Sequence, residues 1–339
     1  MRFLEDLETA IKYFYMLLKT LKGRHYLLLF LVPVLLLLLW MKAFISPVSL
    51  TLGQDQMPLY ELLQQLTGGS IIALNIVGAV ILILLSLLVV RLNERYVFIR
   101  QRTDLPAFVF ALIATGTVSL YGMHPALLAS FLLFFAIDCV FAIYHGSRTL
   151  AKSFEAGLFI GLATTTYLLS GVYLLWFWIA LAFLGYFRPR EILAGLMGFI
   201  LPVFVVLSWY FLNDKLTGLL QTVGSLYSFE FSAEYSMFQK VYWGILAAFV
   251  LIASAFMTNV VEEKKISSRK YFMILFVFFL TAIGNYFIFS SAGTELYFLL
   301  LIPTTFIISH YFVLSRYSWI KEILFVAFVL ASVMIHFLG

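Results

Sequence analysis

The chain has 339 residues, of which 63% are hydrophobic and 12% are charged, and its formal net charge is +5. Soluble domains carry about 25% charged residues, so a mean hydropathy of +1.02 excludes a soluble globular fold. One cysteine, 8 prolines and 20 glycines also exclude a disulfide scaffold, a collagen-like repeat and a low-complexity disordered chain. Since the apolar runs are long and unbroken, and backbone groups in lipid must pair internally, we expect an all-α, polytopic transmembrane helix bundle.

Residues 1–24 predict an amphipathic helix on the membrane surface rather than a signal peptide. Apolar residues recur every three or four positions from Phe3 to Leu21, which places them on one helix face. Glu5 and Asp6 stand where a signal peptide carries basic residues, and no small-residue cleavage site follows. We therefore divide the chain into this interfacial helix, 1–24, and one transmembrane domain, 25–339.

About eleven apolar segments follow, each close to the ~20 residues that cross a bilayer. They lie at 26–46, 70–90, 104–121, 126–145, 155–170, 171–187, 191–212, 241–259, 271–290, 296–314 and 319–338. The stretch 155–187 forms either two spans or one hairpin of two short helices hinged at Ser170–Gly171.

Basic residues predict the orientation of these segments. With a cytoplasmic N-terminus, all of the 22 Lys and Arg residues except Lys42, Lys215 and Lys240 fall on the inner side. Positive charge gathers on cytoplasmic loops, so this bias favours the assigned parity and an outer C-terminus. The net charge then indicates contact with anionic membrane lipids rather than nucleic acid.

The first outer loop, 47–69, contains a second amphipathic pattern. Apolar residues are helically spaced from Leu59 to Leu66, Pro58 suits the first helical turn, and Gly68 suits the end. Glu61 shares the opposite, polar face with two glutamines. Asp55, just before the helix, is either a helix-capping residue or a general base at the membrane surface.

These features, together with the order of loops, resemble the opening of the GT-C membrane glycosyltransferases. The segment 153–202 resembles the G-x-x-x-G-L-A helices of that superfamily, and most of the chain resembles an uncharacterised family of bacterial integral membrane proteins. The resemblance implies a GT-C-like N-terminal half, a bacterial inner-membrane location and a polyprenyl-phosphate-linked sugar as donor at the outer face. Asp55 would then deprotonate the acceptor.

The other candidate site residues lie in the predicted outer loops. Glu61 and Glu295 would line the acceptor side, while Lys215, Lys240 and His124 would meet the phosphate. His124 on its tight turn is otherwise simply solvated. Loop 213–240 is either a surface helix with interfacial aromatics or a cover over a lipid-facing groove. Neither a D-x-D pair nor a His/Cys/Asp/Glu cluster with metal spacing occurs, so we expect no metal or other cofactor.

Several polar or small residues lie inside the predicted apolar segments. Asp138 is either a hydrogen-bonded structural residue or a proton relay, because an intramembrane carboxylate is costly unless paired. Cys139 is expected to pack in the core, and His310 to face the membrane interface. The glycine pairs 157/161 and 195/198 indicate helix packing rather than phosphate binding.

Three functions follow from these observations. The first is a GT-C-like glycosyltransferase, or a non-catalytic relative, that acts on a polyprenyl-phosphate-linked sugar. The second is a transporter or flippase that uses Asp138 as its ionisable switch. The third is a non-catalytic subunit of an envelope-assembly complex, with a membrane protein as its partner.

Overall fold

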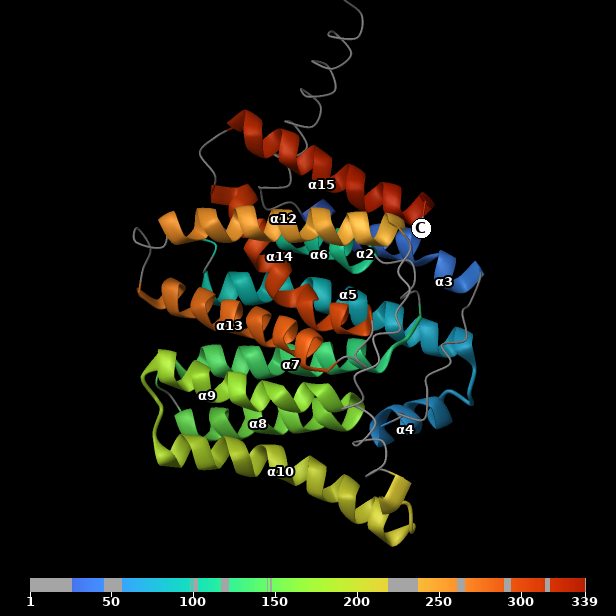
Figure 1. Ribbon diagram of the computed structural model, residues 1–339, viewed down its shortest axis with the longest axis vertical. Helices are drawn as coiled ribbons and strands as arrows, with labels where there is room; N and C mark the ends of the chain where they lie inside the picture. Colours follow the sequence, from blue (N-terminus) through green and yellow to red (C-terminus); the bar gives the residue numbers. More distant parts are fainter. Residues whose placement is uncertain are drawn as a thin grey trace, which may run out of the picture.

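A computed structural model describes most of the chain and is helical throughout the part that it describes (Figure 1). The described residues are 26–45, 57–97, 99, 103–116, 122–144, 146, 148–218, 237–260, 266–289, 294–314 and 318–338. The predicted interfacial helix at 1–24 and Asp55 lie outside these residues.

The described residues between 26 and 172 form seven α-helices and one 3₁₀ helix. They are α2 (Tyr26–Trp40), α3 (Lys42–Ile45), α4 (Pro58–Leu66), α5 (Ile71–Tyr96), α6 (Leu105–Ala114), α7 (Pro125–Ile143), α8 (Thr149–Thr166) and η2 (Leu168–Val172). The second half continues with α9 (Tyr173–Leu184), α10 (Pro189–Leu212), α12 (Met237–Val260), α13 (Ile266–Ile288), η4 (Thr294–Leu296), α14 (Tyr297–Leu314) and α15 (Ser318–Leu338).

Every apolar segment predicted from the sequence overlaps one of these helices. Among the described residues, 6 helices are long and apolar enough to cross a membrane, namely α5, α7, α10, α12, α13 and α14. Shorter apolar helices lie in α2, in α6 and from η2 through α9. The protein is therefore a multi-pass membrane protein, while the count of eleven spans and the orientation stay predictions.

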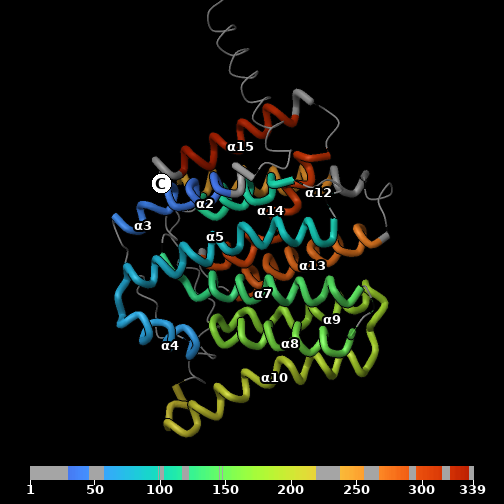
Figure 2. Tube along the Cα trace, turned by 180° about the vertical axis from the view of Figure 1, so that it is seen from behind, coloured from blue at the N-terminus to red at the C-terminus, as the bar shows by residue number. Residues whose placement is uncertain are grey.

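The helices lie side by side in a broad stack (Figures 1 and 2). The stack runs from α10 at one edge through α8, α7 and α5 to α12 and α15 at the other. Helix α14 packs against α6, α7, α12 and α13 and is buried along nearly its whole length, whereas α10 exposes most of its apolar side chains. In a bilayer, this exposed surface contacts lipid chains.

Glycines bring α8 and α10 into backbone contact, and these glycines belong to the pairs for which the sequence predicted helix packing. A Cβ atom added to Gly157 would lie 1.9 Å from the carbonyl oxygen of Gly195. A Cβ atom added to Gly198 would lie 2.1 Å from the carbonyl oxygen of Phe154. Only residues without a side chain allow two helices to approach so closely, which confirms the helix-packing interpretation of both glycine pairs.

The stretch 155–187 forms two helices, α8 and α9, joined by the 3₁₀ turn η2. This turn contains Ser170 and Gly171, where the hinge was expected. Tyr167 caps the end of α8 in an extended conformation, with φ −145° and ψ 108°, and so lets the chain reverse. This reversal places Tyr167 beside His124.

The expectation that His310 faces the membrane interface is wrong. Its side chain is buried in α14, and its ring lies 4.6 Å from the ring of Phe272 on α13. Its position near the end of an apolar segment suggested exposure, but α14 is surrounded by other helices there.

Candidate functional site

The loop at 47–69, predicted to lie on the outer side, contains the amphipathic helix that the sequence predicted. Helix α4 begins with Pro58 at its first position and ends before Gly68 and Gly69, which have φ angles of +62° and +71°. Glycine adopts such left-handed conformations without steric cost, so this pair ends the helix and turns the chain into α5. The roles proposed for Asp55 concern a residue outside the described part and stay predictions.

Two buried polar side chains hold α4 and its neighbours at this end of the bundle. The Tyr60 hydroxyl donates to the Met123 carbonyl at 2.7 Å. The Asn75 side chain accepts from the Met123 N–H at 3.2 Å and donates to the Ala43 carbonyl at 2.8 Å. Burial raises the pKa of Tyr60 to about 12, so its hydroxyl stays a donor at physiological pH. These bonds fix α3, α4 and α5 relative to the turn before His124.

His124 is buried, so the interpretation that it is merely solvated is wrong. Its Nδ1 atom accepts from the Ala126 N–H at 3.1 Å and thereby caps α7. The Phe298 ring stacks at 6.3 Å, and the Tyr167 ring lies edge-on at 6.2 Å. Burial lowers the pKa of His124 to about 3, so the imidazole is neutral at physiological pH. A neutral imidazole with Nδ1 occupied presents Nε2–H as its remaining donor.

Glu295 belongs to the same region of the fold as His124. It lies in η4, which packs against α7, and its carboxylate acts electrostatically on the Tyr167 phenol. The Tyr167 hydroxyl is buried and has no hydrogen-bond partner among the described residues. We call His124, Tyr167 and Glu295 the outer polar cluster, after the side of the membrane on which the sequence predicts them. It combines two residues predicted from the sequence with a phenol that has hydrogen-bonding capacity to spare.

Glu61 lies on α4, which packs against α8. Together with Gln64, Gln65 and Gly69 it lines an open polar hollow. Its charge also acts on Tyr210 of α10. The sequence placed Glu61 on the polar face, and its partial exposure agrees with that placement.

The two lysines expected to meet a phosphate are exposed but far apart in the stack. Lys215 follows α10, and the adjacent Leu216 packs near Met57 and Tyr210. Lys240 lies in the first turn of α12. Helices α10 and α12 lie towards opposite edges of the bundle in both views (Figures 1 and 2). The fold therefore does not bring Lys215 and Lys240 into one site.

Asp138 forms an ion pair with Arg95 in the last turns of α7, the helix that His124 caps at its start. The Arg95 Nη1 atom lies 3.1 and 2.9 Å from its two carboxylate oxygens, and the Tyr96 hydroxyl donates at 3.1 Å. This geometry agrees with a structural residue that links α5 to α7, while a proton-relay role stays a hypothesis. The adjacent Cys139 is buried, as expected for a packing residue.

Three residues around the Met123–His124 turn were not predicted from the sequence. They are Tyr60, Asn75 and Tyr167. Asn75 carried a usable signal, because a carboxamide in an apolar helix needs a partner within the protein. Tyr60 and Tyr167 carried none, since tyrosines are common near membrane interfaces and only the tertiary contacts distinguish these two.

We expect Asn75→Leu to lower the free energy of unfolding by about 2–4 kcal/mol, because it leaves the Met123 N–H and the Ala43 carbonyl buried without partners. Asn213→Leu is the matched control, since Asn213 is exposed and makes one local bond to the Trp209 carbonyl. This control should change the value by less than about 0.5 kcal/mol. Chemical denaturation in detergent micelles measures both, and equal effects would contradict the bridging role of Asn75.

Comparisons of the chain with protein-family models, with curated proteins and with solved structures gave no match.

Proposed function

We propose that the protein is a GT-C-like membrane glycosyltransferase that acts on a polyprenyl-phosphate-linked sugar at the outer end of its helix bundle. In this proposal Asp55 is the general base, and the outer polar cluster binds the polar part of the substrate. Glu61 lines the acceptor side.

One observation carries the proposal. Helix α4, which follows Asp55 by a few residues, is anchored by Tyr60 to the turn that carries His124. Beside this turn lie Glu295 and the Tyr167 hydroxyl, which has no hydrogen-bond partner in the described part of the chain. A lipid-linked sugar needs polar partners next to an apolar phase, and this end of the bundle offers both. The pairing of Asp138 with Arg95 makes it less suited to act as the switch of a transporter.

The test is sugar transfer from a polyprenyl-phosphate hexose by the full chain in membrane vesicles. We expect Asp55→Asn to keep expression and folding but to abolish transfer, because an amide cannot accept the acceptor's proton. Asp214→Asn is the matched control. Asp214 is an exposed acid with φ +55°, a conformation that asparagine tolerates well, so transfer should be unchanged.

Equal transfer by wild type and Asp55→Asn would contradict the role of Asp55. Absence of transfer by the wild-type protein with this donor would contradict the enzyme proposal itself and would favour a non-catalytic subunit of an envelope-assembly complex.

A further inference from the structure

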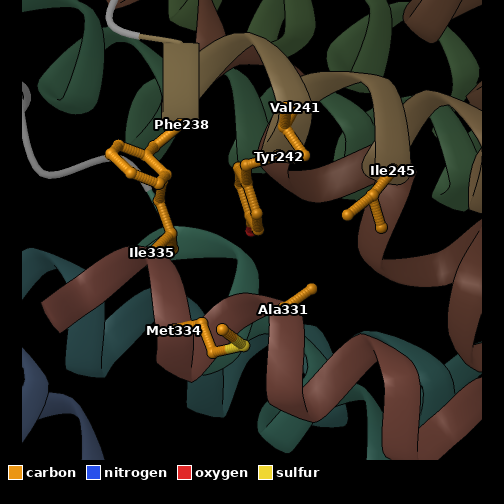
Figure 3. Close-up of a pocket in the computed structure, with 7 residues that line it drawn as sticks. All are labelled: Phe238, Val241, Tyr242, Ile245, Ala331, Met334 and Ile335. Carbon is orange, nitrogen blue, oxygen red and sulfur yellow. The ribbon is translucent and has the colours of Figure 1, made fainter. Parts of the chain in front are cut away.

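A lateral pocket of about 200 Å³ lies between α12 and α15 (Figure 3). Its lining comprises Phe238, Val241, Tyr242, Ile245, Ala331, Met334 and Ile335. On α12 these residues are spaced i, i+3, i+4 and i+7, and on α15 they are spaced i, i+3 and i+4. The facing stripes of the two helices therefore form the walls, and the small side chain of Ala331 leaves room between them.

The pocket opens towards lipid rather than water. Helix α12 is one of the candidate membrane spans, and at the rim Phe238 and Val241 are 50% and 52% exposed. The exposed stripe of α12 continues from Val241 to Ile252, which is 43% exposed. The mouth is thus continuous with the surface that contacts bilayer hydrocarbon, and an apolar recess of this kind does not attract water.

Tyr242 is a buried member of the pocket lining. Tyr242 points between the two helices (Figure 3), and a Cβ atom added to Gly116 would lie 1.9 Å from its hydroxyl oxygen. The next residue, Trp243, packs its ring 5.0 Å from that of Tyr297. The Tyr242 side chain therefore packs against Gly116, which follows the end of α6, and is buried rather than exposed at the pocket mouth.

We propose that this pocket binds one acyl chain of a bilayer phospholipid. A chain that enters the recess gains dispersion contacts on both sides, which the protein's own side chains leave unmade. None of the seven lining residues is charged, so the walls of the pocket offer a head group no ion pair. The pocket therefore takes the hydrocarbon chain that is most abundant beside it, which is a phospholipid acyl chain. This inference is independent of the proposed transferase activity.

The test uses the full chain in phosphatidylcholine nanodiscs that contain a small fraction of phosphatidylcholine with a diazirine on one acyl chain. After irradiation, mass spectrometry maps the lipid adducts. We expect adducts to concentrate on Val241, Tyr242 and Met334 above the level at Leu251, which is 70% exposed on the same α12 surface. Ala331→Trp, which fills the pocket, should reduce them to the Leu251 level.

Leu330→Trp is the matched control, because Leu330 is 50% exposed and does not line the pocket. It adds the same side chain one position away and should leave the adduct pattern unchanged. If Ala331→Trp fails to fold, Ala331→Leu tests the same contact with a smaller side chain. Adducts spread evenly over exposed residues, or an unchanged pattern in the pocket-filling variant, would overturn the proposal. Displacement of the adducts by equimolar polyprenyl phosphate would also overturn it, in favour of an isoprenoid site.

Discussion

Gly157→Ala is expected to destabilise the protein by about 3 kcal/mol or more, the upper range for inserting one methyl group into a packed interior. The new Cβ atom would lie 1.9 Å from the Gly195 carbonyl oxygen and 2.7 Å from its carbon. Both are backbone atoms, so no side-chain rotation relieves the overlap. Helices α8 and α10 have to separate along their glycine contact, and the loss of that packing is the cause of the effect.

The same substitution at Gly284 should have the opposite sign. Gly284 lies in α13, and a Cβ atom there would meet nothing within 4 Å. Replacing a helical glycine by alanine at an unhindered site typically stabilises by about 0.5–1 kcal/mol through lower chain entropy. Gly171→Ala should fall between the two, because its Cβ would meet the Thr164 side chain at 3.3 Å and the Phe199 ring at 4.0 Å but no backbone atom.

Denaturation of the three variants in the same detergent measures the series. If Gly157→Ala does not accumulate, the yield of folded protein by size-exclusion chromatography gives the same order. A Gly157→Ala variant as stable as Gly284→Ala would show that α8 and α10 are not in backbone contact.

The second large effect is a loss of stability in mild acid. The pKa of His124 is about 3 in the folded protein and about 6.5 when it is exposed in the unfolded chain. Between these values the unfolded state binds a proton that the folded state does not bind, so the free energy of unfolding decreases as pH falls. The slope approaches about 1.4 kcal/mol per pH unit, and the loss from pH 7.5 to 5 is about 2 kcal/mol.

His124→Asn separates this contribution from that of the other titrating groups. Asparagine supplies a cap acceptor in place of Nδ1, so α7 keeps its N-terminal bond while the titrating group is removed. We expect the variant to lose about 2 kcal/mol less than wild type over the same pH interval, as measured by thermal unfolding in detergent. Identical pH profiles would mean that His124 is solvated in the native state.

Hydropathy was sufficient for the helices but not for their surroundings. Each apolar run folds as a helix because its backbone must pair internally in lipid, and the Pro58 and Gly68 signals bounded α4 correctly. The exposure predicted for two histidines from their position in the sequence was wrong. His124 looked solvated because it lies on a short turn, and His310 looked interfacial because it lies near a helix end. Both are buried by aromatic residues from helices distant in the sequence.

The candidate site shows the same division. Position along the chain placed His124, Glu295, Lys215 and Lys240 in outer loops, which says nothing about how those loops are arranged around the bundle. The fold brings His124 and Glu295 together beside Tyr167, and leaves the two lysines on helices towards opposite edges.

The amino-acid sequence by itself determined that this is a helical, multi-pass membrane protein, because hydrophobicity and backbone pairing are properties of each segment alone. It also indicated that the glycine pairs 157/161 and 195/198 serve helix packing, whereas the structure showed that the two pairs bring α8 and α10 together. Only the tertiary structure decided which polar groups meet and where a lipid chain can enter. Lateral order in a bundle depends on side-chain fit between helices, which local periodicity does not encode.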